Sequence, residues 1–390
     1  MKPHVDPAPR KILLHIRSLH IGGAERQVVS LTKTMAGTGT EVHVATVAAG
    51  GPLESDLEGI QGVQLHSPGR SGPIGKLRYL LRLRSLIKSN RYDAVYGFLP
   101  TPNLALLVAR TIRHRPLIAW GVRSSGLDLN QYSKRVKWAM RLEKWLSKFA
   151  DRIITNSQAA LEEYRQSGYA YSKLSYIPNA INVERFKPNP NARKSVRQEL
   201  GISDNAPVIG IFARLHPMKD HTTFLKAASI LVESMPTARF ICAGGTSAEN
   251  SGYANGIKNT AVELGLEDNV LWLGPRNDPE LLMPACDLTT LSSDSGEGFP
   301  NSVAESMACG IPCVVTDVGD SAAIAPDISM VVQHGNPEEL ATAWISALQP
   351  ALLQDQTKID DTAIAARTSI IERYSPAEIS RMTLAVLTDA

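Results

Sequence analysis

Two glutamates stand in a run of the chain that leads from a predicted strand into a predicted helix. Glu297 lies at the tip of a turn flanked by glycines, and Glu305 lies two turns into the helix predicted over Asn301–Ala308. Backbone N–H groups at such a helix start can bind an anion, and a carboxylate can accept hydrogen bonds from paired hydroxyls such as those of a ribose. A helix cap with two solvated glutamates is the alternative, which the apolar residues around Glu305 disfavour.

Two cations follow another predicted strand, Val208–Phe212. Arg214 and Lys219 lie five positions apart, just before a predicted helix. An arginine can bind phosphate oxygens through two N–H groups, and a lysine adds a mobile charge. The pair therefore suits the developing negative charge of a diphosphate leaving group. The alternative is a solvated cationic loop.

A glycine pair, Gly22 and Gly23, follows the predicted strand Lys11–Ile16 and precedes a predicted helix. Glycines let the backbone approach a ligand at a helix start. The spacing is not the Gly-x-Gly-x-x-Gly of dinucleotide sites, which disfavours a nicotinamide-dependent oxidoreductase. From the pair alone, a ligand loop and a simple flexible helix start are equally supported.

Short apolar strands alternate with helices along the chain, which predicts parallel sheets covered by helices on both faces. The other predicted strands are Glu41–Val47, Asp93–Tyr96, Leu117–Trp120, Arg152–Thr155, Arg239–Ala243, Val270–Leu273, Asp287–Leu291, Pro312–Thr316 and Ser329–Val332. The predicted helices include Ala24–Met35, Gly75–Ser89, Asn103–Arg113, Ser133–Phe149, Ala192–Leu200 and Thr222–Glu233. In such sheets ligands bind beyond the carboxyl ends of the strands, where all three motifs lie.

Prolines and asparagines gather over residues 178–207 and interrupt the alternation, which indicates a connector. We therefore expect two doubly wound α/β domains facing across a cleft. The N-terminal domain covers residues 1–180, the C-terminal domain covers residues 181–374, and residues 375–390 form a C-terminal helix.

The charge differs between the two halves of the chain. Residues 1–175 hold 26 Lys and Arg against 12 Asp and Glu, whereas residues 176–390 hold 15 against 26. This asymmetry suggests domains with different partners. The chain has only 4 cysteines and no Cys-x-x-Cys, so we expect reduced core cysteines rather than a disulfide scaffold or a zinc site. We expect no signal peptide and no membrane-spanning run, and therefore a cytoplasmic protein.

The run from Gly296 to Pro312 resembles the Glu-x7-Glu signature of glycosyltransferase family 4. The resemblance extends over most of the chain. Its other carriers are Gly22-Gly23-Ala24-Glu25-Arg26, Ile177-Pro178-Asn179-Ala180-Ile181-Asn182, Arg214 with Lys219, and Leu273-Gly274 with Arg276. The resemblance implies a GT-B fold, in which an N-terminal Rossmann-like domain binds the acceptor and a C-terminal one binds a nucleotide sugar. It also implies that the C-terminal helix, residues 375–390, crosses back to the N-terminal domain.

The resemblance also implies a role for each matching residue. Arg214 and Lys219 bind the donor diphosphate, and Glu297 contacts the transferred sugar. The remaining donor-binding positions are Gly298, Phe299 and Pro300 near the sugar and distal phosphate, Glu305 at the ribose, Arg276 near the base, and Gly22 and Gly23 from the other domain. The family retains the anomeric configuration and is generally metal-independent. The chain has no Asp-x-Asp, so no metal and no cofactor is expected beyond the nucleotide-sugar co-substrate.

The N-terminal domain departs from many relatives, which carry a histidine after the strand that corresponds to Leu117–Trp120. This chain has Arg123 in that neighbourhood. We therefore name Arg123 as an acceptor-binding candidate that would hold an acceptor hydroxyl or phosphate.

The predicted helix Ser133–Phe149 is rich in Lys and Arg and carries Trp138 and Trp145 on one face. Such a helix can lie on an anionic bilayer and bring a lipid-linked acceptor to the site, at the inner face of the membrane. Two core tryptophans beside a solvated charged face are equally compatible with the pattern. No nucleic-acid motif accompanies the charge, so no nucleic-acid partner is expected.

The sequence therefore predicts a retaining hexosyltransferase that moves a sugar from a nucleotide sugar, favouring a UDP-sugar, to a polysaccharide, lipid-linked or glycolipid acceptor. Two alternatives remain open: a GT-B nucleotide-sugar epimerase, and a non-catalytic membrane-surface adaptor that kept the fold. The intact set of Arg214, Lys219, Glu297 and Glu305 disfavours the adaptor.

Overall fold

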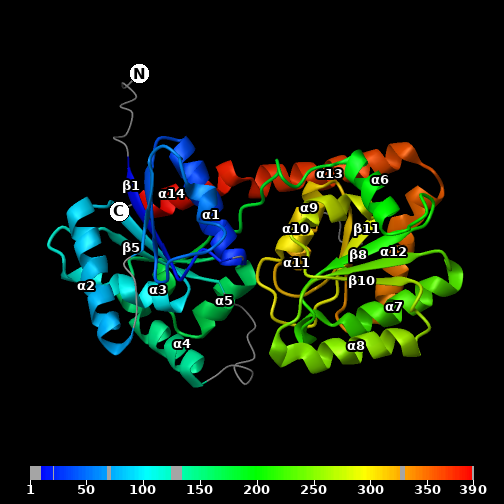
Figure 1. The fold of residues 1–390 in the computed structure, drawn as a ribbon, viewed down its shortest axis with the longest axis horizontal. Coiled ribbons are helices and arrows are strands. Elements are labelled where there is room, and N and C mark those ends of the chain that lie inside the picture. The colour runs from blue at the N-terminus through cyan, green and yellow to red at the C-terminus, as the bar shows by residue number, and fades with distance from the viewer. Residues whose placement is uncertain (1–9, 21, 68–71, 124–133, 326–329, 389–390) are drawn as a thin grey trace. The chain divides into compact units, whose positions relative to one another are not determined.

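The computed structural model describes residues 10–20, 22–67, 72–123, 134–325 and 330–388. The chain divides into two compact units (Figure 1). The first unit comprises the described residues up to Ala180 together with the segment from Pro376 onward, and the second unit is Ile181–Ser375.

The first unit is built on a parallel sheet of seven strands in the order β3-β2-β1-β4-β5-β6-β7. The strands are β1 (Lys11–Ile16), β2 (Glu41–Thr46), β3 (Val63–His66), β4 (Ala94–Phe98), β5 (Leu117–Val122), β6 (Arg152–Thr155) and β7 (Leu174–Tyr176). Its helices are α1 (Gly23–Gly37), α2 (Gly72–Asn90), α3 (Pro100–Ala105), α4 (Lys134–Leu146), α5 (Gln158–Gln166) and α14 (Pro376–Thr388).

Strand β1 shows why both faces of this sheet are covered. Ile12, Leu14 and Ile16 lie in a core with residues of α1 and α14, whereas Leu13 lies in a second core with residues of α2. Alternate side chains of a strand point to opposite faces, so a strand that buries apolar side chains in both directions needs helices on both faces.

The second unit has a parallel sheet of six strands in the order β10-β9-β8-β11-β12-β13. The strands are β8 (Val208–Phe212), β9 (Arg239–Ala243), β10 (Val270–Gly274), β11 (Leu288–Leu291), β12 (Cys313–Thr316) and β13 (Val331–Val332). Its helices are α6 (Pro190–Glu199), α7 (His221–Ser234), α8 (Ser251–Glu263), α9 (Pro279–Leu282), α10 (Asn301–Ala308), α11 (Ser321–Ile324), α12 (Pro337–Leu352) and α13 (Gln356–Tyr374).

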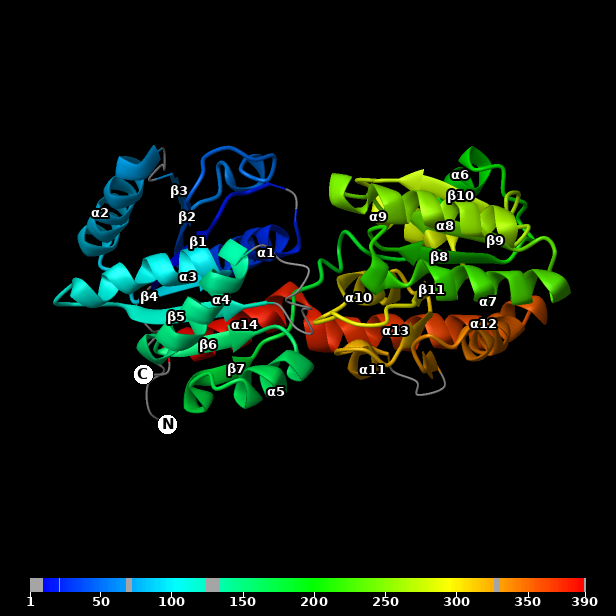
Figure 2. The same cartoon turned by 90° about the horizontal axis from the view of Figure 1, so that it is seen from below.

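Helices cover both faces of this sheet as well (Figure 2). Phe224 of α7 and Trp344 of α12 pack in one core with residues of β8, and Met307 of α10 and Ile370 of α13 pack in another. Each unit is therefore a doubly wound, Rossmann-like α/β fold, as the alternation of strands and helices predicts.

Two predicted helices differ from the structure. The helix expected over Asn103–Arg113 is the α-helix Pro100–Ala105 followed by a 3₁₀ helix, Leu106–Thr111. The helix expected over Ser133–Phe149 begins outside the described residues at its first position, runs as an α-helix to Leu146 and ends in a 3₁₀ turn, Ser147–Phe149. A tighter turn at a helix end is common because it pairs carbonyls that would otherwise lack partners.

Candidate functional site

The topology of the second unit brings two of the predicted motifs together. β8 lies at the point where the strand order reverses, with β9 on one side and β11 on the other. In doubly wound sheets the crevice at this point receives the ligand. The loop after β8 carries Arg214 and Lys219, and the loop after β11 carries Glu297.

Lys219 and Glu297 form an ion pair across this edge of the sheet, although they lie 78 positions apart in sequence. Their side chains are 15% and 7% exposed, respectively, so the pair is largely removed from water. The Ser293 hydroxyl donates to the same carboxylate oxygen, Oε1 of Glu297.

The two loops are also joined through their backbones. The Asp294 amide donates to the Met218 carbonyl at 3.1 Å, and the Ser292 hydroxyl donates to the Lys219 carbonyl at 2.8 Å. Asp220 then adopts a left-handed conformation with φ of 42° and caps α7 by accepting from the Thr223 amide. Lys219 is therefore held between a hydrogen-bonded loop and a fixed helix start.

The end of β12 and the loop that follows it contact the backbone near Glu297. The Thr316 hydroxyl donates to the Ser293 carbonyl at 2.7 Å, and the Asp320 amide donates to the Gly298 carbonyl at 3.1 Å. Gly319 approaches so closely that a Cβ atom there would lie 2.2 Å from the Glu297 carbonyl oxygen. These contacts fix the backbone on both sides of the Glu297 carboxylate.

Arg214 lies in the same loop as Lys219, with its side chain exposed. Burial, and then the positive charges of Arg214 and Lys219, lower the pKa of His216 below its ordinary value. His216 accepts from the Met218 amide at 3.3 Å, which is consistent with a neutral ring that shapes the loop. The charges of both predicted cations therefore reach the same residue, His216, at this edge of the sheet.

The predicted helix after Glu297 is α10, with Pro300 at its N-cap. Phe299 is buried against Tyr374, with the ring centroids 5.1 Å apart, and Gly298 is half-buried. Glu305 lies on α10 and is half-exposed. The N-terminal end of a helix favours an anion, so α10 begins beside the ion pair with the correct polarity for a phosphate.

Arg276 lies after β10, two strands away from β8. Its guanidinium donates to Asp278 at 2.8 and 2.7 Å and to Glu199 at 3.2 Å. The hydrogen bonds to Asp278 lead the causes that raise the pKa of Arg276. This geometry places Arg276 in a local network with two carboxylates, and its contact with a base stays a prediction.

The remaining predicted residues belong to the first unit. Gly22 is the N-cap of α1 in an extended conformation, and Gly23 is the first residue of that helix. They therefore lie at the carboxyl end of β1, where the strand order of this sheet reverses. Their closing over a donor stays a prediction.

Arg123 follows β5 at the same edge of the first sheet. It donates to the Asn179 side chain at 2.6 Å, and its guanidinium carbon lies 4.9 Å from the centroid of the Phe98 ring. The Arg123 Nε–H is buried and has no hydrogen-bond partner among the described residues. Burying a hydrogen-bond donor without a partner is energetically unfavourable, so this N–H is available to a hydrogen-bond-accepting oxygen of a ligand.

Three supporting residues escape prediction from the sequence: Ser293, Thr316 and Gly319. Ser293 stands in a serine-rich run, where its type alone carries no signal. Its importance comes from the chain reversal that turns its hydroxyl toward Glu297, and Thr316 and Gly319 depend on the pairing of β12 with β11.

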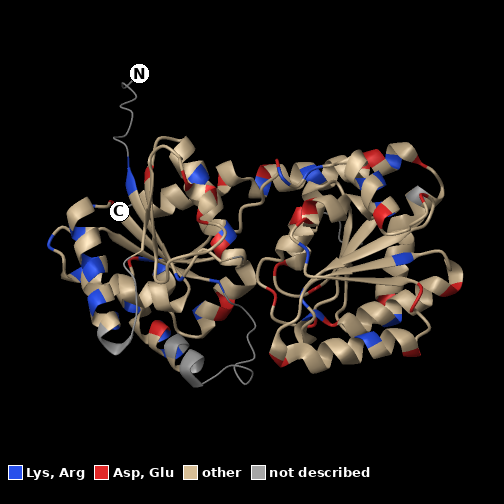
Figure 3. Cartoon of the chain, in the orientation of Figure 1, with Lys and Arg blue, Asp and Glu red and all other residues tan. Residues whose placement is uncertain are grey.

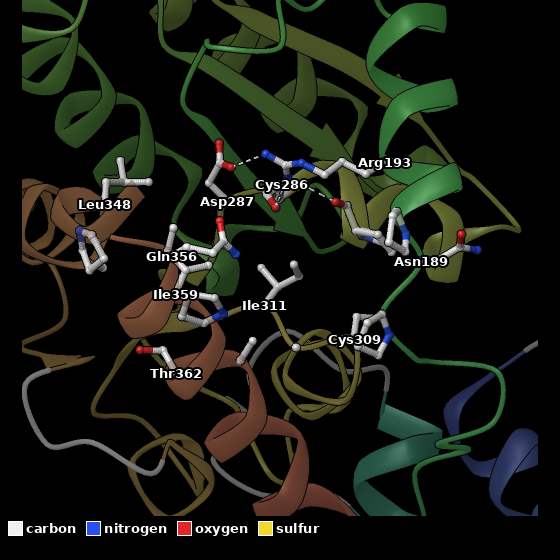
Figure 4. Close-up of a pocket in the computed structure, with 18 of the residues that line it drawn as sticks. Asn189, Arg193, Cys286, Asp287, Cys309, Ile311, Leu348, Gln356, Ile359 and Thr362 are labelled. Carbon is white, nitrogen blue, oxygen red and sulfur yellow. Dashed lines mark hydrogen bonds and ion pairs between the residues drawn. The ribbon is translucent and has the colours of Figure 1, made fainter. Parts of the chain in front are cut away.

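A separate cavity of about 610 Å³ lies at the opposite, amino-terminal edge of the second sheet (Figure 4). Arg193 and Asp287, which line it, are already paired with each other, and the Asn189 side chain caps α6. Cys286 and Cys309 also line this cavity, and all four cysteines of the chain are free and buried. We assign no ligand to it.

Among the described residues, no group of three or more His, Cys, Asp or Glu side chains is arranged to hold a metal ion. Across the same part of the chain, no helix combines the length and the apolar composition that crossing a bilayer requires.

Two family models match the chain. Residues 21–185 match Glycosyltransferase Family 4, and residues 192–363 match Glycosyl transferases group 1. Among curated proteins, the chain is 26% identical over 253 residues to an Escherichia coli UDP-Gal:alpha-D-GlcNAc-diphosphoundecaprenol alpha-1,3-galactosyltransferase, covering 63% of each chain. It is 25% identical over 396 residues to a D-inositol 3-phosphate glycosyltransferase of Thermobispora bispora, covering 91% of this chain and 90% of the relative.

Solved structures share the fold. The crystal structure of Anabaena Alr3699/HepE in complex with UDP and glucose matches with a TM-score of 0.80 and 24% identity, covering 98% of this chain and 100% of that one. WaaG, a glycosyltransferase involved in lipopolysaccharide biosynthesis, matches with a TM-score of 0.70 and 18% identity, covering 97% and 100%.

Proposed function

Because the chain belongs to glycosyltransferase family 4 and has the GT-B fold of a sugar-transferring enzyme, we propose that it moves a sugar from a UDP-sugar to a lipid-linked or glycan acceptor with retention of configuration. The observation that carries this proposal is the meeting of Lys219 and Glu297 beside the start of α10. The curated relatives whose names include a UDP-sugar, a diphospholipid or an inositol phosphate support the donor and acceptor classes.

In the proposed reaction, the bond between the anomeric carbon and the diphosphate breaks, and an acceptor hydroxyl oxygen bonds to that carbon on the same face. The acceptor proton passes to a diphosphate oxygen. Arg214 and Lys219 neutralise the charge that grows on the leaving diphosphate, and the N-terminus of α10 adds partial positive charge. Cations of the chain thus take the part that a divalent metal has in other transferases.

The other residues orient the donor and acceptor. Glu297 accepts hydrogen bonds from hydroxyls of the transferred sugar, and Glu305 accepts from the two ribose hydroxyls. The backbone of Gly298 and Phe299 approaches the sugar and the distal phosphate. We further propose that the backbone of Gly22 and Gly23 approaches the nucleotide sugar, and that the Arg123 Nε–H donates a hydrogen bond to the acceptor substrate.

The first experiment is a thermal-shift comparison of UDP, GDP, ADP and NAD in the presence of EDTA. We expect UDP to raise the melting temperature, because a ligand that binds only the folded state stabilises it. The shift should be clearly smaller in Lys219→Ala and keep its full size in Lys226→Ala, a matched variant of an exposed lysine on α7. A shift with NAD alone would overturn the proposal, and a UDP-sugar converted to its epimer without acceptor would favour the epimerase.

We also propose that α4 contacts an anionic membrane surface. Trp138, Leu142, Trp145 and Phe149 recur every three or four residues and are 70%, 44%, 64% and 37% exposed, respectively. We call these four residues the tryptophan face. Large exposed apolar patches mark interaction sites, and tryptophan favours the boundary between water and lipid.

The charge around the tryptophan face favours lipid as its partner. Arg141, Lys144 and Lys148 are exposed on the same helix and turn, and the Lys148 ammonium lies 5.0 Å from the Trp145 ring centroid. Figure 3 shows further Lys and Arg on the helices of this unit, notably on α2. Basic residues beside apolar ones attract anionic headgroups while the rings enter the interface. A lipid-linked acceptor would be presented at such a surface.

A further inference from the structure

The ammonium of Lys219 already forms an ion pair with a carboxylate of the protein, that of Glu297. Glu297 pairs with it in a largely buried position, although the proposed function requires the same lysine to bind the donor diphosphate. The position of the Glu297 carboxylate is restricted, because Gly319 lies close to the Glu297 backbone and the Ser293 hydroxyl donates to the carboxylate. A diphosphate that reaches Lys219 therefore comes close to a fixed negative charge.

We propose that Glu297 gives up its ion pair with Lys219 when a diphosphate binds. The loss of this ion pair weakens the binding of the nucleoside diphosphate product relative to the binding of the intact donor. This inference rests on the proposed function. It assigns to Glu297 an effect on product release, which is separate from its contact with the sugar.

The physical reason lies in what replaces the ion pair. When an intact nucleotide sugar binds, the sugar hydroxyls donate to the Glu297 carboxylate and compensate it for the lost lysine. When UDP binds, no sugar is present, and the carboxylate loses its cation while it faces the negative diphosphate. A largely buried carboxylate that loses its cation is destabilised, so the binding of UDP carries an energetic cost that the binding of the intact donor avoids.

Two neighbouring groups set the limits of this effect. Arg214 is exposed in the same loop and can neutralise part of the diphosphate charge without leaving a carboxylate partner. Ser293 also donates a hydrogen bond to the Glu297 carboxylate, and this bond does not involve Lys219. The discrimination should therefore depend on the Lys219–Glu297 pair rather than on the general charge of the loop.

The experiment measures UDP binding by isothermal titration calorimetry for wild type and Glu297→Gln. We expect Glu297→Gln to bind UDP more tightly, by about threefold or more, since the amide releases Lys219 and removes the negative charge. The gain should be smaller for UMP, which carries one phosphate fewer. Glu305→Gln is the matched control and should bind UDP more weakly, because it lies on α10 at the proposed ribose contact.

A double-mutant cycle tests whether the effect of Glu297 on UDP binding depends on its ion pair with Lys219. In a Lys219→Met background, Glu297→Gln should improve UDP binding clearly less than it does in the wild-type background. An undiminished gain would mean that Glu297 only repels the diphosphate, and it would overturn the proposed role of the ion pair. An unchanged or weaker UDP affinity of Glu297→Gln, with a wild-type melting temperature, would also overturn the proposal. If Glu297→Gln does not fold, Glu297→Ala replaces it in the cycle. Failure of the wild type to bind UDP, GDP and ADP would instead overturn the proposed function.

Discussion

At the scale of single residues, Ser293 is the side chain that orients the Glu297 carboxylate, since its hydroxyl donates to Oε1 from a fully buried position. We expect Ser293→Ala to lower kcat about tenfold, because one hydrogen bond to a charged group is lost. KM for the UDP-sugar should change much less, and Ser293→Thr should restore part of the rate.

Steady-state kinetics with a UDP-sugar and its acceptor check the Ser293 prediction. The matched control is Ser295→Ala, because Ser295 is exposed and donates only to its neighbour Asp294 in the same loop. Equal losses of kcat in both variants would contradict a positioning role.

Gly319 gives a second residue-level prediction, which concerns stability. Gly319 and Gly335 both have a positive φ, of 61° and 70°, but a Cβ at Gly335 meets nothing within 4 Å. Gly335→Ala should therefore cost only the left-handed strain, about 1 kcal/mol, whereas Gly319→Ala adds a backbone clash. We expect a clearly lower melting temperature for Gly319→Ala by calorimetry, together with weaker UDP binding. Equal melting temperatures for the two variants would refute the close approach.

At the scale of elements, α4 is anchored to the first sheet by Glu143, which is 3% exposed. The Asn103 side-chain amide donates to this carboxyl at 2.6 Å and to the Gly121 carbonyl of β5 at 3.0 Å. Burial raises the pKa of Glu143 to about 7, and the Asn103 hydrogen bond opposes the rise only in part.

The raised pKa predicts a pH-dependent stability. Because the folded-state pKa lies above the ordinary glutamate value of 4.5, the free energy of unfolding falls as the pH rises from about 4.5 to about 7 and then levels off. Above pH 7 the cost is on the order of 3 kcal/mol. Glu143→Gln should therefore stabilise the protein at pH 8 and much less at pH 5.

Urea unfolding of the wild type and Glu143→Gln at both pH values checks this prediction. Glu267→Gln, which changes an exposed carboxylate, is the control and should leave both stabilities unchanged. A stabilisation of the same size at pH 5 and pH 8 would show that Glu143 does not titrate in this range.

The strands show which elements a sequence can reveal. β1, β6, β8 and β9 have the predicted bounds, because each is a short segment with a largely apolar centre. β3 and β7 escape prediction. They lie at the two edges of their sheet, and their side chains are only partly buried, so the hydrophobic signal is weak. These two edge strands are identified by their pairing rather than by their composition.

The tryptophan face illustrates a second limit. The spacing of Trp138 and Trp145 predicts one face of a helix, but it does not decide which face meets the sheet. The structure turns Glu143 inward and the tryptophans outward. The residues proposed to bind the donor show the same limit. Lys219 and Glu297 each lie in a loop after a strand, as predicted, but their meeting depends on the pairing of β8 with β11.

At the scale of the whole molecule, the charge asymmetry gives a prediction for membranes. Residues 1–175, which contain the tryptophan face, carry 26 Lys and Arg against 12 Asp and Glu. We expect the protein to co-sediment with vesicles that contain phosphatidylglycerol and not with pure phosphatidylcholine vesicles. Replacing Trp138 and Trp145 by serine should weaken vesicle binding on the order of tenfold, since both rings lose their interfacial burial.

Two controls make the membrane test specific. Leu353→Ser removes an exposed leucine of the acidic second unit, 75% exposed, and should leave vesicle binding unchanged. The UDP thermal shift of the double tryptophan variant should equal that of the wild type. Undiminished vesicle binding by the double variant would move the contact away from α4, and no binding to either vesicle would favour a protein partner.

The first unit is closed by the last helix of the chain, and this has a consequence for biosynthesis. Ile379 and Leu387 of α14 complete the core that contains β1, and Arg10 donates to Thr388 at 2.8 Å. A ribosome that has just made Ala180 has therefore not yet supplied a part of the fold that this unit needs. At about 5 to 20 residues per second, the missing helix arrives about 10 to 40 s later. During that interval the nascent unit exposes an apolar groove, so its passage through translation should depend on chaperones until α14 has been synthesised.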